Sequence, residues 1–375
     1  MIYLDNAATS FPKPESVCRK VDIILREIGG NPGRASHRMA VHALRVIFDA
    51  REAVSRLIGA PDSSRIVFTK NATEAINIAL KGLLKPDDHV ITTVFEHNSI
   101  VKTIGRLEKD GVRVSRLKPD SRGFISPEDI EKAMRENTKM VCLAHASNVF
   151  GTLQPVEEIA AVCRRRGVLF MVDGAQTVGA FPMDVTAMGI DILAATGHKA
   201  LLGPQGTGFL YLRESVEPVP LIDGGTGEED TILDIPERLE SGTMNMPGVG
   251  GLGAGVEFVL KEGVHRIRAH EEALTGEIIT GLKAVKGVAI IGAPEASKRA
   301  SLVAFNIEGV KARDAGIRYD SEFSIMLRCG THCAPMAHME AKTYPEGAIR
   351  VSPGYFNTQG DIAEFLRATS EIAKI

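Results

Sequence analysis

Long apolar runs are missing from this chain of 375 residues. No window comes near the roughly 18 uninterrupted apolar residues of a transmembrane helix, so we expect no membrane span. A surplus of charge is missing as well, because 44 basic and 47 acidic residues leave a net charge of −3. Such a balance gives no electrostatic basis for binding nucleic acid. The opening residues, MIYLDNAATS, include neither the basic nor the apolar stretch of a secretory signal.

Cysteine is scarce, and its positions do not suggest pairing. The five cysteines are odd in number and scattered: Cys18, Cys142, Cys163, Cys329 and Cys333. Disulfide-stabilised secreted domains carry even sets of cysteines, so we predict reduced thiols and a cytoplasmic location. With 44% hydrophobic residues the chain can bury a large core, and its length predicts about two or three domains.

Strand-like and helix-like segments alternate through the first two thirds of the chain. Runs rich in β-branched residues lie at 65–69, 89–94, 112–117, 140–144, 168–172, 190–195 and 208–212, and helical spacing lies at 74–84, 100–110, 127–136 and 156–166. Apolar strands separated by helices predict an α/β fold with a mostly parallel sheet covered on both faces. Ligands of such sheets bind beyond the carboxyl ends of the strands.

The last third has a different pattern. Residues 221–247 are rich in glycine, proline and acids and predict a loop, and a helical segment follows at 249–282. Shorter strands are expected at 288–291, 301–306, 324–327 and 348–351, with a final helix at 359–372. We therefore expect a large domain at 15–255 and a smaller α+β domain formed by 256–375 together with 1–14.

Two charged residues follow neighbouring predicted strands. Asp173 ends a buried apolar run, and an acid there needs a cation or strong donors, such as a protonated pyridine nitrogen. Lys199 follows the next strand 26 positions later, where a lysine with a lowered pKa can form a Schiff base with an aldehyde. Taken by itself, Asp173 would be interpreted as a helix cap and Lys199 as a surface lysine. Together they indicate a pyridoxal-type site.

Other strand ends carry small or polar residues. Ala72 and Thr73 open a helix, whose free N–H groups and dipole favour a phosphate. Thr196 and His198 would add hydrogen bonds, and His97 can stack on a flat ring and move protons. A plain helix cap and an incidental loop histidine are the alternatives.

An ordered set of motifs extends over nearly the whole chain: Tyr3–Ala8, Ala72–Glu74, Glu96–His97, Ser147–Gly151, Asp173–Gln176, Gly197–Lys199 and Ser241–Thr243. The set resembles class V of the fold-type I pyridoxal-phosphate enzymes, and within it the cysteine desulfurases and selenocysteine lyases. This resemblance implies the fold-type I architecture, pyridoxal 5'-phosphate as cofactor and a homodimer.

The resemblance also implies roles around the cofactor. Lys199 would form the Schiff base, Asp173 would pair with the pyridine nitrogen and His97 would stack on the ring. Gln176 and Asn148 would lie near the phenolic oxygen. The phosphate would be bound by Ala72, Thr73, Thr196 and His198, and Thr243 would reach the phosphate of the neighbouring subunit.

The segment Arg328–Pro335 bears on the type of reaction. It resembles the short-loop, Suf-type branch of the desulfurases, which implies Cys333 as nucleophile in a loop of the small domain. The thiolate is the reactive form, and the adjacent His332 would help to hold it. A buried, incidental thiol is the alternative for Cys333 and the preferred reading of Cys329. A zinc site including His332 and His338 is disfavoured by the ligand spacing, so no metal is expected.

Substrate binding is assigned by the same resemblance. Arg350 matches an arginine that clamps the substrate carboxylate, for which a bidentate guanidinium is well suited. Asn148 and Arg328 are further candidates, and the segment 31–37 adds Arg34 and His37 as weaker ones. His145, His265 and His270 are interpreted as structural.

The expected function is a cysteine desulfurase that gives alanine and a persulfide on Cys333, or that releases selenium from selenocysteine. Another class V aminotransferase or lyase is the first alternative, and a catalytically silent scaffold of the same fold is the second. A sulfur-acceptor protein, such as an iron–sulfur scaffold, is an expected partner. The sequence does not distinguish cysteine from selenocysteine.

Overall fold

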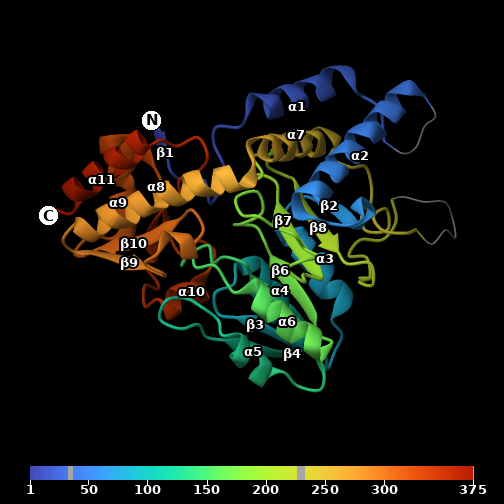
Figure 1. The fold of residues 1–375 in the computed structure, drawn as a ribbon, viewed down its shortest axis with the longest axis horizontal. Helices are drawn as coiled ribbons and strands as arrows, with labels where there is room; N and C mark the ends of the chain where they lie inside the picture. The colour runs from blue at the N-terminus through green and yellow to red at the C-terminus, as the bar shows by residue number, and fades with distance from the viewer. Residues whose placement is uncertain (33–36, 226–232, 375) are drawn as a thin grey trace.

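The computed structural model describes residues 1–32, 37–225 and 233–374. The chain forms two units of different size, each built around its own sheet. Both termini lie on the smaller, C-terminal unit (Figure 1). The larger unit carries the strand ends to which the motifs belong. The smaller unit lies beside it and contributes the segment that contains Cys333.

The large unit contains a seven-stranded sheet in the order β2-β8-β7-β6-β5-β3-β4. Its strands are β2 (Ile66–Thr69), β3 (His89–Thr93), β4 (Arg113–Leu117), β5 (Thr138–Ala144), β6 (Leu169–Asp173), β7 (Ile192–Thr196) and β8 (Gly208–Leu212). Only β8 runs against its neighbours, since it pairs antiparallel with β2 and β7 while the other pairings are parallel. The mostly parallel sheet is confirmed, and β2, β3, β5, β6 and β7 end at one edge.

Alternation along each strand divides the core into two layers. In β6, Phe170 and Val172 pack on one face and Met171 on the other, all fully buried. Burial of each such side chain contributes about 1.5–3 kcal/mol. Helices α2 (Arg38–Ile58), α6 (Val156–Arg166) and α7 (Met246–Glu262) cover the first face, and α3 (Ala72–Leu83) and α4 (Asn98–Lys109) cover the second. Helix α5 (Pro127–Ala133) packs on α6, and α1 (Glu15–Glu27) packs on α7.

The small unit has a four-stranded antiparallel sheet in the order β12-β13-β10-β9. It contains β9 (Val288–Ile291), β10 (Val303–Ile307), β12 (Arg328–Gly330) and β13 (Ala348–Val351), with helices α8 (Val264–Ala284), α9 (Ala312–Phe323), α10 (Pro335–Glu340) and α11 (Gln359–Ile372). Strand β1 (Ile2–Tyr3) pairs with β11 (Ile325–Met326), which joins the N-terminal residues to this unit. Short 3-10 turns lie at Ser63–Arg65 and Ala296–Lys298.

The structure differs from the sequence-based prediction at the junction of the units. The single helical segment expected at 249–282 is two helices, because Gly263 separates α7 from α8 with a φ of 85°. The expected domain boundary at 255–256 therefore falls inside α7. From that junction α8 extends into the C-terminal unit (Figure 1). Helices α1, α2, α9 and α10 and strands β1 and β12 were also not predicted.

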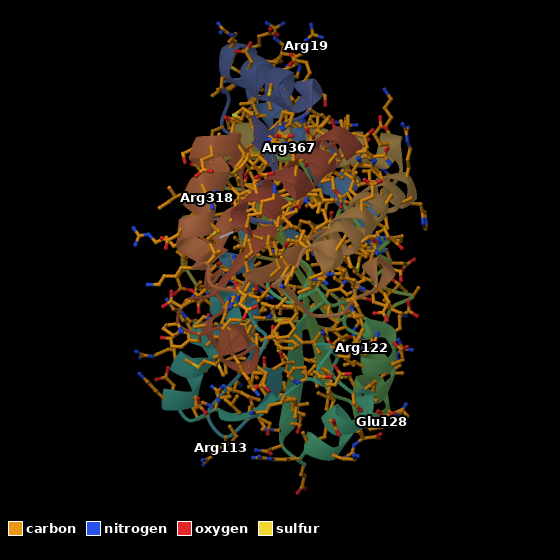
Figure 2. The ribbon with its side chains drawn as sticks, turned by 90° about the vertical axis from the view of Figure 1, so that its left-hand side faces the viewer. Arg19, Arg113, Arg122, Glu128, Arg318 and Arg367 are labelled. Carbon is orange, nitrogen blue, oxygen red and sulfur yellow. The ribbon has the colours of Figure 1, made fainter. Side chains whose placement is uncertain are left out.

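The outer surface carries charged side chains on both units. Arg19, Arg113 and Arg318 project from the periphery of the molecule (Figure 2). Within the described residues no helix combines the length and apolarity required to cross a membrane.

Candidate active site

Five strands of the large sheet deliver polar side chains to one pocket at their shared edge. We call it the strand-end pocket; it is lined by Asn71, Ala72 and Thr73 after β2, His97 and Ser99 after β3, Ala144, Ala146 and Asn148 at the end of β5, Asp173, Ala175 and Gln176 at the end of β6, and Thr196, His198 and Lys199 at the end of β7. The sequence analysis placed its cofactor candidates at these strand ends. The structure brings all of them together except Thr243.

Lys199 and Asp173 form the charged centre of the strand-end pocket. Burial lowers the pKa of Lys199 to about 8, although the nearby Asp173 carboxylate opposes this shift. Burial raises the pKa of Asp173, whose Oδ1 accepts a hydrogen bond from the Ala175 N–H at 2.9 Å. A cation opposite Asp173 would favour its charged form, and a lysine with a pKa near 8 can act as a nucleophile.

One end of the strand-end pocket is suited to an anion. Asn71 caps α3 by accepting from the Glu74 N–H at 3.0 Å, which places Ala72 and Thr73 at the positive end of the helix. His198 is next to this helix end, and its Nδ1 is buried without a hydrogen-bond partner in the described part of the chain. A buried ring nitrogen of this kind requires a ligand or water. Phosphate oxygens would supply it.

His97 is neutral and oriented by α4. It is the N-cap of that helix, and its Nδ1 lies 3.2 Å from the Ser99 N–H and 2.9 Å from Ser99 Oγ. Burial, and then the positive charge of Lys199, lower the pKa of His97 to about 4. Because Nδ1 accepts from the Ser99 N–H, the ring proton lies on Nε2.

Cys333 lies on a tight turn between β12 and α10, and we call Thr331–Ala334 the thiol turn. The guanidinium Nη2 of Arg328 donates to Cys333 Sγ at 3.4 Å. His332 was expected to help hold the thiolate, but its ring nitrogens contact other groups and not the sulfur. Burial lowers the pKa of His332 to about 2, and its ring nitrogens contact His338 and the Arg328 carbonyl. The positive charge beside the sulfur therefore comes from Arg328.

The thiol turn adjoins the strand-end pocket. Asn148 Nδ2 donates to the His332 carbonyl at 2.6 Å, so one residue of the pocket holds the turn. The charges of Arg328 and Cys333 both act on the pKa of Lys199, which shows that the thiol and the lysine share one electrostatic environment. Over the residues that the structure describes, no group of three or more His, Cys, Asp or Glu side chains has the arrangement of a metal site. Burial raises the pKa of Cys329 to about 12, as in an unreactive structural thiol.

Arg350 is fully buried on β13 and already has partners. Its Nη2 lies 3.0 Å from Asp5 Oδ1, and its Nη1 donates to the Asn148 carbonyl at 3.1 Å. Its Nε has no partner among the described residues. Asp5 was not expected as this counter-ion, although it belongs to the motif Tyr3–Ala8.

The remaining candidates lie elsewhere or are partly occupied. Gln176 Nε2 donates to the Ala7 carbonyl at 3.2 Å. Thr243 is exposed and lines a different groove, together with Lys70. His37 is the exposed N-cap of α2 and does not line the strand-end pocket. Arg34 lies outside the described residues.

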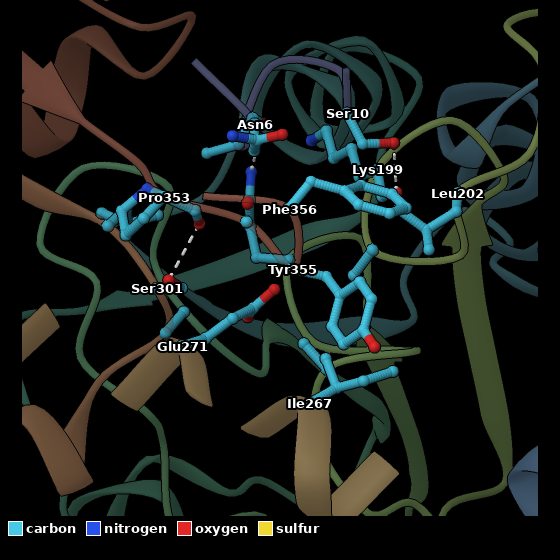
Figure 3. A pocket seen from close by; sticks show the side chains of 17 residues that line it. Asn6, Ser10, Lys199, Leu202, Ile267, Glu271, Ser301, Pro353, Tyr355 and Phe356 are labelled. Atoms are coloured by element: carbon cyan, nitrogen blue, oxygen red, sulfur yellow. Dashed lines mark hydrogen bonds between the residues drawn. The ribbon is translucent and has the colours of Figure 1, made fainter. Parts of the chain in front are cut away.

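A second pocket adjoins Lys199 and includes residues that the sequence analysis missed. Figure 3 shows Lys199 and Ser10 at one side of it and Glu271 and Ile267 at the opposite side. Ser10 Oγ donates to the Lys199 carbonyl at 2.8 Å and so fixes the backbone of the lysine. Burial raises the pKa of Glu271 to about 8. Glu271 gave no sequence signal because it lies within an ordinary helical pattern.

Comparison with known proteins identifies the class. The sequence pattern of the family described as Aminotransferase class-V matches residues 2–365, and the chain belongs to this family. Enzymes of this family depend on pyridoxal 5'-phosphate, and the chain is one of them.

The similar proteins are more specific. A probable cysteine desulfurase of Methanothermobacter thermautotrophicus is 37% identical over 99% of this chain and 94% of its own length. Cysteine desulfurase IscS of Dictyoglomus turgidum is 30% identical over 96% of this chain and 91% of its own length. The apo structure of a cysteine desulfurase from Thermococcus onnurineus superposes with a TM-score of 0.93 at 34% identity, covering 100% of this chain and 94% of that one. These similarities confirm the fold-type I architecture.

Proposed function

We propose that this protein is a pyridoxal-phosphate-dependent cysteine desulfurase, which transfers the sulfur of L-cysteine to Cys333 and leaves L-alanine. The supporting observation is the contact of 3.4 Å between Arg328 Nη2 and Cys333 Sγ, beside Lys199. A transaminase needs the lysine and the acid but has no use for a thiol in this place.

The strand-end pocket fits the cofactor. The unpartnered His198 Nδ1, with Thr196 and the α3 N-terminus at Ala72 and Thr73, would hold the phosphate. Asp173 would pair with the ring nitrogen, His97 would stack on the ring, and Gln176 and Asn148 would lie near its phenolic oxygen. When bound, the cofactor supplies an electron sink next to the substrate α-carbon.

Lys199 would attach the cofactor and move the α-proton of the substrate. Its pKa of about 8 means that protonated and neutral amine coexist near that pH. One side chain can therefore both accept and return a proton.

Cys333 would attack the substrate sulfur. A bond forms between Sγ and that sulfur while the carbon–sulfur bond breaks, and the electron pair stays with the carbon, which takes up a proton. Cysteine and the enzyme thiol thus give alanine and an enzyme persulfide. Arg328 would stabilise the attacking thiolate by a charge-assisted hydrogen bond. The short thiol turn is compatible with the Suf-type branch, which remains a prediction.

Arg350 would bind the substrate carboxylate. Full burial makes its guanidinium a strong site for an anion, and its free Nε leaves a donor for a second partner besides Asp5. Arg34 and His37 remain weaker candidates for this role.

A homodimer is part of the proposal. Helix α2 exposes Val41, Leu44 and Phe48 by 55%, 51% and 47%, and their spacing of three and four residues gives one apolar face. Thr243 is exposed outside the strand-end pocket of its own chain, as expected if it reaches the phosphate of a neighbouring subunit. A sulfur-acceptor protein would remove the persulfide. The five free cysteines agree with a reducing cytoplasm.

The deciding experiment compares cysteine and selenocysteine as substrates of the parent and of Cys333→Ala. We expect Cys333→Ala to lose alanine formation from cysteine and to retain it from selenocysteine, since selenium can leave without attack by the thiol. If the variant matches the parent on cysteine, and cysteine is consumed only with an added keto acid that takes up its amino group while the sulfur stays on carbon, the protein is an aminotransferase of the same class.

A further inference from the structure

The thiol turn adopts a backbone conformation that its residues do not favour. His332 and Cys333 have φ values of 51° and 59°, in the left-handed region. This region is sterically unfavourable for residues that carry a Cβ, and here two such residues follow one another. Because no regular element imposes this geometry, contacts from outside the turn must stabilise it.

Two of these contacts hold the main chain. The Asn98 N–H donates to the Cys333 carbonyl at 2.9 Å, and Asn148 Nδ2 donates to the His332 carbonyl at 2.6 Å. Both come from the large unit. They fix where the turn lies relative to the strand-end pocket, but neither acts on the position of the turn relative to Arg328.

A chain of side chains within the small unit supplies that link. His332 Nδ1 lies 3.2 Å from His338 Nε2, and His338 Nδ1 lies 2.7 Å from Thr343 Oγ1. At the other end, His332 Nε2 lies 3.3 Å from the carbonyl oxygen of Arg328. The two rings are 3% and 0% exposed, so water does not compete for their nitrogens.

The carbonyl oxygen of Arg328, at the end of this chain of side chains, determines the direction of every hydrogen bond in it. A carbonyl oxygen only accepts, so His332 Nε2 carries the proton and its Nδ1 accepts. His338 Nε2 must then donate to His332, which leaves His338 Nδ1 to accept from the Thr343 hydroxyl. Both rings are neutral in this arrangement, because burial lowers the pKa of His332 to about 2 and that of His338 to about 4.

We propose that His338 and Thr343 are positioning residues for the thiol: through His332 they connect the thiol turn to the main chain of Arg328 and hold Cys333 Sγ against the Arg328 guanidinium. The proposal rests on the proposed function in one respect, the role of Cys333 as nucleophile. The charged groups that act on Cys333 are Arg328 on β12, Arg350 on β13 and Lys199 after β7. Of these three residues, Arg328 is the one whose carbonyl oxygen accepts the hydrogen bond of His332 at the end of the chain of side chains.

Paired variants of the holoenzyme test the proposal. His338→Leu removes the donor to His332, whereas His338→Gln keeps an N–H donor at the position of Nε2. Thr343→Val removes the hydroxyl without a change of shape, and Thr343→Ser keeps it. Loss of one buried hydrogen bond is expected to lower kcat for cysteine on the order of 10-fold in His338→Leu, and about 3-fold in Thr343→Val. KM should stay unchanged, and the Gln and Ser variants should retain activity.

Alkylation of Cys333 by iodoacetamide, followed on its own peptide by mass spectrometry, gives a readout that does not require turnover. We expect the alkylation rate at one fixed neutral pH to fall in His338→Leu and Thr343→Val, because the sulfur loses its contact with the Arg328 guanidinium, and to stay at the parental value in His338→Gln and Thr343→Ser.

Parental kcat and parental alkylation rates in both disruptive variants would overturn the proposal, as would a Gln variant as impaired as the Leu variant. If His338→Leu fails to fold, the Thr343 pair decides. Failure of the proposed function looks different: Cys333→Ala would then turn over cysteine like the parent, while the alkylation rates of the other variants would still report on the turn.

Discussion

The strand-end pocket and the thiol turn solve the same problem, the placement of reactive side chains, in different ways. In the pocket, Asp173 and Lys199 follow β6 and β7, whose positions in the sheet are set by parallel and antiparallel ladders and by two buried layers. In the turn, Cys333 has a positive φ and depends on contacts from Asn98 and Asn148 and on the chain of side chains that begins at Thr343.

The difference separates two parts of the chemistry. The pocket holds the lysine and the acid that we propose to bind the cofactor, and a rigid sheet suits that fixed requirement. The turn provides the step that concerns sulfur, and it belongs to the other unit. A change in the pocket should therefore affect every reaction of the protein, whereas a change in the turn should affect only reactions that use the thiol.

Replacement of Lys199 is expected to have the largest effect. In Lys199→Ala the attachment point and the proton-transfer group are lost together, so turnover of both cysteine and selenocysteine should fall by at least about 10³-fold. The visible absorbance band of the bound cofactor should shift at the same time. A variant that keeps the parental band would show that Lys199 is not the attachment point, and the pocket would lose its assigned role.

Replacement of Cys333 comes next and should separate the two regions. Cys333→Ser should lower desulfuration of cysteine by about 10²-fold or more while the cofactor absorbance stays parental. Cys329→Ser is the matched control, because Cys329 packs against Gly316 and should behave as a structural thiol. Equal losses in the two serine variants, measured as alanine and sulfide formed, would contradict the distinction between the two cysteines.

The same contrast explains how much of the structure could be predicted. The strands of the large sheet and the cofactor candidates at their ends follow local patterns, in which apolar runs stop at Asp173 or precede Lys199. Helix α11 was expected at 359–372 and lies at Gln359–Ile372. Burial on both faces leaves a signal in the strands of the large sheet except β4, which is partly exposed, so the fold class could be predicted.

The thiol turn could be predicted only in part from the sequence. The motif around Cys333 marked the nucleophile, but the neighbour that contacts its sulfur is Arg328 and not the adjacent His332. A turn with two positive φ values at non-glycine residues has no local signature. Partners such as Asp5, which lies 345 positions from Arg350, are set by tertiary packing and not by spacing.

Arg350 connects the two regions, because it contacts Asn148 of the pocket and interacts with Cys333 of the turn. Arg350→Lys keeps the charge but loses the planar fork, so we expect KM for cysteine to rise about 10-fold or more, with a smaller change in kcat. Steady-state kinetics at saturating cofactor measure this. A fall in kcat alone would assign Arg350 to the stability of the Asp5 pair and not to the substrate.

The smallest effect is expected at Glu96, which is part of the rigid framework of the pocket. Its Oε2 accepts from the Ala144 N–H at 2.9 Å, and its Oε1 lies 2.6 Å from Thr93 Oγ1. Burial raises the pKa of Glu96 from 4.5 to about 8. Between these two pH values the folded protein holds a proton that the unfolded chain releases, so this residue makes the free energy of unfolding decrease as pH rises from about 4.5 to 8.

Glu96→Gln resembles the protonated acid and removes this dependence. Relative to the parent, the variant should gain on the order of 4 kcal/mol in unfolding free energy between pH 5 and pH 9. Urea unfolding of the holoenzyme at the two pH values measures the difference, and Glu74→Gln, at a partly exposed acid on α3, is the control. A parent and variant whose stabilities run parallel with pH would mean that Glu96 is ionised in the folded protein. The end of β3 would then contain a buried negative charge, and the strand-end pocket would need a cation in addition to Lys199 to balance Glu96 and Asp173.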